Sequence, residues 1–324
     1  MDFETEDDHG FTPLGIAADQ GHLSAVRLLL RVANVNAANN KTFGRTPLNR
    51  VSMQGHPMVA EELRKAPGID VNKGDLWGRA PLHSASWYGH FHVVQALLRS
   101  PDLNVNAIDS RNRTALLWAS FLGHMEIVQA FLEAPNIDVN IDDQYGTTPL
   151  HWAAYTGHQK VVEALLDSPN ISVNAREKDG DTPLHLASLK GFHQIAQTLL
   201  NAPNINVNPL DDNGRTPLYW ASHNGHHDVV KALLNSTDID VNSATKRGMT
   251  PLCAASLNRH LDVVRDLLLC PHTDATMVCQ GKTALELAKR EEQVEIVSLM
   301  EDPVELLLSG HNSCPNLRTP RHSK

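Results

Sequence analysis

The sequence predicts a mainly α-helical solenoid of tandem helix–turn–helix units with short β-hairpins. Three markers recur every 34 residues along the 324-residue chain, and they keep a fixed phase with one another. The first is a block of the Thr-Pro-Leu type, the second is a proline that ends an apolar stretch, and the third is a Val-Asn pair. A fixed period of roughly 20 to 50 residues is the signature of stacked repeats.

The markers place nine repeats along the chain. The blocks begin at Thr12, Thr46, Ala80, Thr114, Thr148, Thr182, Thr216 and Thr250, and Thr283 follows one residue early. The Val-Asn pairs end at Asn72, Asn106, Asn140, Asn174, Asn208 and Asn242. We therefore expect an array over 1–301 whose repeats start near residues 7, 41, 75, 109, 143, 177, 211, 245 and 278. Residues 302–324 leave the pattern and contain three prolines, so we expect a flexible C-terminal tail.

The fifth unit shows why each repeat forms two helices. Thr148 can cap the first helix and Pro149 suits its first turn, because the proline φ angle is already helical. Gly157 ends this helix, since glycine adopts the left-handed conformation at little cost. The second helix carries an apolar stripe over 161–166. One such unit cannot cover its own apolar face, so neighbouring units must stack.

Two departures from the pattern predict local weak points. Ala80 replaces the capping threonine and cannot offer a side-chain oxygen, which costs roughly 0.5–2 kcal/mol. Arg259 stands at a helix-ending glycine position, where we expect a left-handed backbone.

Composition excludes several classes of protein. Hydrophobic residues make up 41% and charged residues 20% of the chain, as in a folded soluble protein. The net charge of −9 argues against nucleic-acid binding. No apolar run approaches the ~20 residues of a membrane span, and the acidic opening does not resemble a signal peptide. The four cysteines show no paired spacing, which argues against a disulfide scaffold and favours the cytoplasm, with the nucleus as the alternative.

The recurring motif of the fifth unit consists of Thr148-Pro149-Leu150-His151, Ala153-Ala154, Gly157-His158 and Val173-Asn174. This motif resembles the ankyrin repeat, and the resemblance covers roughly residues 7 to 300. It implies L-shaped units, each a β-hairpin and two antiparallel helices, stacked into a curved solenoid. It also implies a protein without a catalytic residue pattern, and we expect no cofactor and no enzymatic activity.

The resemblance implies that the hairpin tips and the exposed ends of the first helices line a concave face. Large aromatic residues and arginines gather at these positions in repeats 2 to 5, as in protein-binding hot spots. Filling of gaps between neighbouring tips is the alternative explanation. The predicted partner-binding residues are Phe43, Trp77, Trp87, Tyr88, Arg111, Arg113, Phe121, Tyr145 and Tyr155.

Three further tryptophans and the later repeats lead to different expectations. Trp118, Trp152 and Trp220 precede the small residues of the first helix, so we expect them to pack between helices. Beyond Lys178 the same surface becomes polar and of mixed charge, including Lys246 and Arg247. A solvated face and a second contact zone are equally compatible with that change.

Histidine is abundant, with 18 residues, but most occupy repeat positions with a structural role. The resemblance implies that imidazoles in the Thr-Pro-Leu-His block bind nearby backbone and threonine. The densest cluster comprises His223, His226, His227 and Asp228, and it lacks a cysteine or a second carboxylate, so we expect no metal site.

Two functions remain from the sequence. The first is a non-catalytic interaction module or scaffold that binds another protein through the concave face and the hairpin tips. Arginines at the tips, Arg45, Arg79 and Arg113, would favour an apolar segment with acidic flanks. The alternative is an enzyme or small-molecule-binding protein that uses the aromatic groove of repeats 3–5, with histidines such as His223 transferring protons. Neither function involves a nucleic acid or a membrane.

Overall fold

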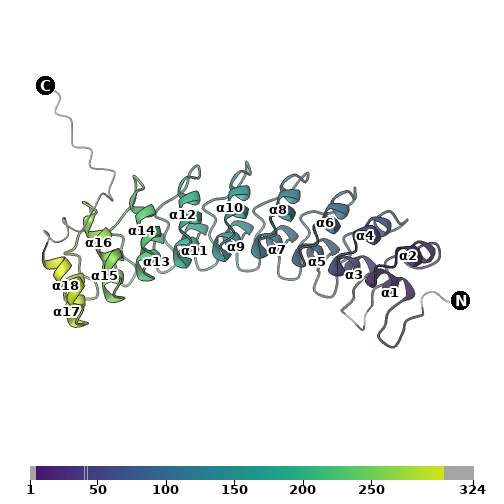
Figure 1. Cartoon of the computed structure of the whole chain (residues 1–324), viewed down its shortest axis with the longest axis horizontal. Helices are drawn as coiled ribbons and strands as arrows, with labels where there is room; N and C mark the ends of the chain where they lie inside the picture. The colour runs from purple at the N-terminus through teal and green to yellow at the C-terminus, as the bar shows by residue number, and fades with distance from the viewer. Residues whose placement is uncertain (1–4, 40, 42, 303–324) are drawn as a thin grey trace, which may run out of the picture. The chain divides into compact units, whose positions relative to one another are not determined.

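The computed structural model describes residues 5–39, 41 and 43–302, and these residues contain 18 α-helices and no extended strand (Figure 1). The chain divides into two compact units, Met1–Ile171 and Ser172–Lys324. Apart from Asp302, the predicted tail at 302–324 lies outside the described residues.

The helices come in pairs, one pair for each sequence repeat. In the first unit the first helices are α1 (Pro13–Asp19), α3 (Pro47–Gln54), α5 (Pro81–Trp87), α7 (Ala115–Leu122) and α9 (Pro149–Thr156). Their second helices are α2 (Leu23–Leu29), α4 (Pro57–Leu63), α6 (Phe91–Leu98), α8 (Met125–Leu132) and α10 (Gln159–Leu166). In the second unit the first helices are α11 (Pro183–Lys190), α13 (Pro217–His223), α15 (Pro251–Leu257) and α17 (Ala284–Arg290). Their second helices are α12 (His193–Leu200), α14 (His227–Leu234), α16 (Leu261–Leu269) and α18 (Val294–Glu301).

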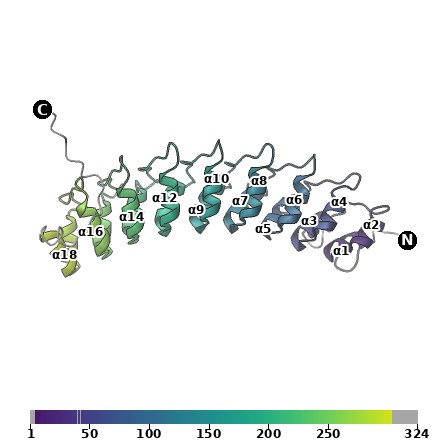
Figure 2. The same ribbon diagram turned by 45° about the horizontal axis from the view of Figure 1, so that its top comes forward.

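Helices of the same kind lie side by side within each unit. First helices contact the first helices of adjacent repeats and second helices contact second helices, as both views show (Figures 1 and 2). Leu150, Ala153 and Val162 are fully buried between these layers. The small alanine side chain allows this close approach, and the predicted helical solenoid is confirmed.

The predicted helix boundaries follow from the capping residues. The Thr148 side chain accepts a hydrogen bond from the backbone N–H of His151, and Gly157 ends α9 at φ 85°. Ala80 makes no side-chain cap, as expected. Arg259 has φ 65°, so the predicted left-handed backbone is present without glycine.

The hairpins are tight turns with isolated bridges rather than strands. Such bridges join Asn39 to Arg45, Ile108 to Thr114 and Cys279 to Lys282. The turns are held instead by acidic side chains. For example, the Asp109 carboxylate accepts the backbone N–H groups of both Arg111 (2.8 Å) and Arg113 (3.0 Å).

The asparagine of each Val-Asn pair fastens its repeat to the next one. The Asn72 amide nitrogen donates to the Asp102 carbonyl (2.7 Å), and its amide oxygen accepts the Asn104 N–H (2.8 Å). A net gain of about 0.5–1.5 kcal/mol for each hydrogen bond makes this marker a stabilising contact at the junctions where it occurs. The same two bonds recur at Asn106, Asn174, Asn208 and Asn242.

A histidine precedes every second helix except α12 and α18, and most of these rings contact the preceding repeat. The His90 ring nitrogen Nε2 lies 2.9 Å from the carbonyl oxygen of Met53, at the end of the preceding first helix. Equivalent contacts are made by His56, His158, His226 and His260. These contacts give the abundant histidines the structural role expected from the sequence.

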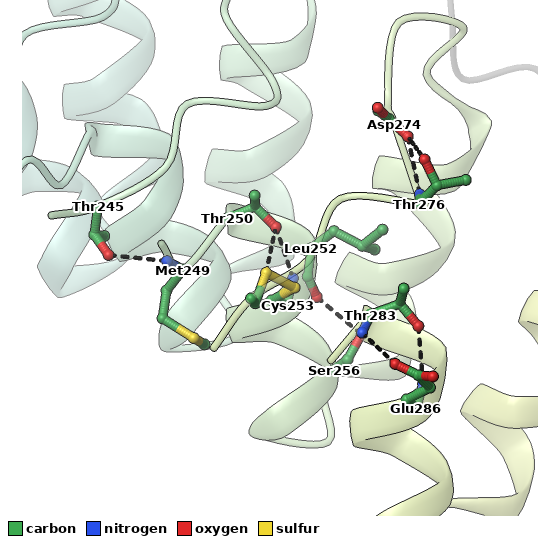
Figure 3. The surroundings of a disulfide bond; sticks show 11 residues. Thr245, Met249, Thr250, Leu252, Cys253, Ser256, Asp274, Thr276, Thr283 and Glu286 are labelled. Atoms are coloured by element: carbon green, nitrogen blue, oxygen red, sulfur yellow. Dashed lines mark hydrogen bonds between the residues drawn. A yellow bond between two sulfur atoms is a disulfide. The ribbon is translucent and has the colours of Figure 1, made fainter. Parts of the chain in front are cut away.

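A disulfide between Cys253 and Cys279 replaces a hydrogen bond that other repeats make at the same position (Figure 3). In α11 that position carries His185, whose Nε2 lies 3.0 Å from the carbonyl oxygen of Arg215 in the next hairpin. The lack of paired spacing argued against a disulfide scaffold, and it did not indicate this one bridge between Cys253 and Cys279. Their 26-residue separation forms no local motif, and stacking of the repeats brings the buried sulfurs together. Cys270 is buried and free.

Candidate functional site

All nine predicted partner-binding residues lie in the first unit, on the hairpins and the first helices. Six aromatic side chains among them are exposed, from Tyr155 at 37% to Tyr145 at 55%. Arg111 is exposed, whereas Arg113 and Phe121 are half-buried. Exposed aromatic residues in such number form a surface that can bury apolar area against a partner.

Five aromatic rings, three from the predicted residues together with Trp118 and Trp152, form a continuous series of edge contacts. We call this series the aromatic row. It runs from Trp87 to Trp118 (4.2 Å between centroids), Phe121 (6.1 Å), Trp152 (4.9 Å) and Tyr155 (6.0 Å). The rings come from three consecutive first helices, α5, α7 and α9. Contacts of this kind hold the exposed rings in place before any partner binds.

Trp118 and Trp152 are members of the aromatic row rather than of the core. Both are half-buried, and so is Trp220 in the second unit. Trp118 and Trp152 pack between neighbouring first helices, as expected, with their rings against Trp87 and Phe121. Their burial is partial, and the fully buried position belongs to the alanine that follows, Ala119 or Ala153.

The aromatic row ends at a hollow of about 280 Å³ between the third and fourth repeats, which we call the aromatic hollow. Its walls come from two hairpins, from α5 and α7, and from Met53 of α3. They include Trp77, Trp87, Tyr88, Arg111 and Trp118. The hollow therefore offers the surfaces of three tryptophans and one tyrosine, with three arginines, Arg79, Arg111 and Arg113, in its lining.

Most of the tip arginines are already neutralised. Arg79 pairs with Asp75 at 2.7 Å and its guanidinium lies 4.4 Å from the centre of the Trp77 ring. Arg113 pairs with Asp109, also at 2.7 Å. Although burial opposes ionisation, the hydrogen bonds from Arg113 hold the pKa of Asp109 below its usual value. These arginines stiffen the hairpins and stabilise the adjacent rings.

Arg111 differs from the other tip arginines because it has no ion-pair partner in the described part of the chain. Its exposed guanidinium remains available at the rim of the aromatic hollow. Arg45 also lies near the Asp75 carboxylate, with 4.0 Å between the nearest atoms. The three tip arginines that the sequence suggested for acidic groups, Arg45, Arg79 and Arg113, therefore each have a carboxylate neighbour, and Arg111 has no such neighbour among the described residues.

The histidines of the sequence cluster around His223 have separate contacts in the structure. Within residues 5–39, 41 and 43–302, no group of three or more His, Cys, Asp or Glu side chains could hold a metal ion. His226 contacts the Leu189 carbonyl, whereas His227 lies 2.7 Å from Asp266, so the cluster seen in the sequence has separate partners. His83, the imidazole of the aromatic hollow, accepts the Ala80 N–H and donates to the Arg113 carbonyl.

The paired helices, the ladders of asparagine and histidine, and the exposed aromatic row define a helical tandem-repeat protein. A family model of three ankyrin repeats matches residues 14–109, 82–177 and 169–245, and a model of the single ankyrin repeat matches 247–276. The chain belongs to the ankyrin repeat family. Ankyrin repeats are in general protein–protein interaction modules and are typically not enzymes.

A search among proteins of curated function found no match. No helix of the described residues is long and apolar enough to cross a membrane.

Proposed function

We propose that this protein is a non-catalytic scaffold that captures a segment of another protein on the aromatic row and the aromatic hollow. The observation that carries the proposal is the unbroken series of ring contacts from Trp87 to Tyr155, in which the two end rings are exposed and the three between them are half-buried. Rings that are held in place lose little conformational freedom when they bind, so less of the free energy of their burial is offset by ordering.

The partner segment would carry apolar or aromatic anchors with an acidic residue beside them. Trp77, Trp87 and Tyr88 would receive the anchors in the aromatic hollow, and Arg111 would pair with the acid. Phe43 and Trp77 form a second ring contact, with 4.7 Å between centroids, that would extend the surface towards the second repeat.

The location that fits this proposed function is the cytoplasm or the nucleus. Glutathione and thioredoxin keep thiols reduced there, so Cys253 and Cys279 would be thiols in that setting. The enzymatic alternative has little support in the aromatic hollow. Both ring nitrogens of its imidazole, His83, are occupied by backbone groups, and burial lowers the pKa of His83.

Selection from a displayed library of random 12-residue peptides tests the proposal. The full chain should enrich peptides with aromatic or aliphatic anchors beside Asp or Glu. An enriched peptide should shift the tryptophan fluorescence, because four of the five tryptophans lie in the aromatic row or the aromatic hollow.

The double variant Trp87→Ala/Tyr88→Ala should weaken binding at least tenfold while circular dichroism and the melting temperature stay nearly unchanged. The matched control is Leu28→Ala/Met58→Ala, which removes two exposed apolar side chains from second helices of the same unit. Wild-type affinity in the Trp87/Tyr88 variant, or equal loss in the control, would contradict the proposed site.

A further inference from the structure

A second hollow, of about 420 Å³, lies in the second unit between the seventh and eighth repeats. We call it the basic hollow, and its lining includes Asn213, Tyr219, His223, Lys246, Arg247 and Met249. It occupies the same place in its repeats as the aromatic hollow. Asn213 follows Trp77 by 136 residues, which is four repeats of 34, and Arg247 follows Arg111 by the same number.

The same structural position has a different chemistry in the two hollows. Three tryptophans of the aromatic hollow are replaced by smaller residues, and this replacement accounts for the larger volume. Asn213, His223 and Ala254 stand where the aromatic hollow has Trp77, Trp87 and Trp118. The remaining apolar wall consists of Met249, Leu257 and Ala254.

Positive charge in the basic hollow is not compensated. Lys246 and Arg247 are exposed on the hairpin, and neither has an ion-pair partner among residues 172–302 that the structure describes. Arg215 is neutralised by Asp211 at 2.5 Å. No carboxylate lines the hollow. In a chain with a net charge of −9, two adjacent free cations are a local exception that favours anionic groups.

The imidazole of His223 is a further polar group of the basic hollow, and its neighbours determine which ring nitrogen carries the hydrogen. The Asn258 side-chain nitrogen donates to the Ala254 carbonyl (2.9 Å), which sets the orientation of the amide. The same nitrogen lies 2.9 Å from Nδ1 of His223, so Nδ1 accepts and Nε2 carries the hydrogen. The His223 ring also stacks on Tyr219, with 5.8 Å between centroids and 8° between planes. His223 is therefore a held hydrogen-bond donor.

We propose that the basic hollow binds an acidic segment of a protein partner. A Glu or Asp carboxylate of that segment contacts Lys246 and Arg247, and an adjacent aliphatic side chain packs on Met249 and Leu257. An isolated patch of two cations in an acidic chain suits a short acidic peptide, whereas a nucleic acid requires an extended basic surface. The inference shares with the proposed function only the class of partner, because the basic hollow and the aromatic hollow have no residue in common.

The test repeats the 12-residue peptide selection with the full chain as wild type, as Lys246→Glu/Arg247→Glu and as Trp87→Ala/Tyr88→Ala. Wild type should enrich a class of peptides with two or more Asp or Glu residues next to Leu, Ile, Val or Met. The charge reversal should eliminate this class, and the Trp87/Tyr88 variant should retain it. Anisotropy of one labelled peptide from this class should show at least tenfold weaker binding to the charge-reversal variant.

The control Arg99→Glu/Lys160→Glu makes the same change in net charge at two exposed positions, directly after α6 and within α10. Equal loss in this control, or no acidic class in the wild-type selection, would overturn the proposal. A milder variant guards against misfolding of the charge reversal. Lys246→Gln/Arg247→Gln removes only the charge. It should weaken binding of the labelled peptide, and unchanged affinity would also overturn the proposal.

Discussion

The imidazole of His90 occupies the space that a β-carbon on Gly55 would need. A β-carbon built at Gly55 would lie 2.5 Å from Nδ1 of His90, and Gly55 has φ 79°. The glycine that ends α3 therefore has two functions, since it adopts the left-handed turn and admits the ring that bonds the Met53 carbonyl.

Gly55→Ala should destabilise the first unit by roughly 2–4 kcal/mol, because it adds a clash with His90 to the strain of a left-handed alanine. Gly68→Ala is the matched control, since Gly68 has φ 74° but open space around the position of a β-carbon. Its cost should be only about 1 kcal/mol. Urea unfolding of both variants measures the difference, and equal costs would show that the His90 contact contributes nothing.

The sixth repeat lacks the charge pair that stabilises other hairpins. Arg215 pairs with Asp211 four residues earlier, but the equivalent residues of the sixth repeat are Asp181 and Glu177. Burial first, and then the nearby Asp211 and Glu177 carboxylates, raise the pKa of Asp181 to about 7. The folded protein thus holds this proton more tightly than the unfolded chain.

The sign of the pH dependence follows from that difference. The contribution of Asp181 to the free energy of unfolding falls as the pH rises from about 4 to about 7. At pH 8 the carboxylate is ionised in both states, and its burial destabilises the folded protein in full. Asp181→Asn should therefore raise the melting temperature at pH 8 by a few degrees, corresponding to about 1 kcal/mol for a partly screened group. The gain should vanish near pH 4. Asp102→Asn, at an exposed position, should change little, and a gain that does not depend on pH would refute this explanation.

The Cys253–Cys279 disulfide should protect the last repeat from local unfolding. It closes a loop of 26 residues, for which the expected stabilisation is roughly 3 kcal/mol. Reduction, or Cys253→Ser, should accelerate hydrogen exchange in α17 and α18 by up to about a hundredfold, and leave α11 unchanged. Cys270→Ser is the control for loss of a buried cysteine. Identical exchange in oxidised and reduced protein would contradict a stabilising role.

The helices could be predicted from the sequence because their limits are set locally. Thr148 and Gly157 act on the backbone within one turn of their own positions, so the pattern that contains them fixes where α9 begins and ends. The left-handed Arg259 was predictable for the same reason.

The character of the site depends on neighbours that a linear pattern does not show. Arg79 looks like a free cation in the sequence, and only the hairpin turn places it against Asp75. The position of Trp118 in the aromatic row depends on its contact with Trp87 of the preceding repeat. The sequence did contain one signal for the basic hollow. The 34-residue period relates the residues that line it to those that line the aromatic hollow.

The disulfide also changes how the chain responds to a pulling force. The disulfide is the shortest covalent connection between Cys253 and Cys279, and it holds their Cα atoms 6.6 Å apart. When the ends of the oxidised protein are drawn apart, the 26 residues of the loop cannot extend. The extended length is therefore shorter by about 80 Å than that of the reduced protein, since a residue spans at most ~3.3–3.6 Å. The oxidation state of one cysteine pair thus sets the length to which the chain can be stretched.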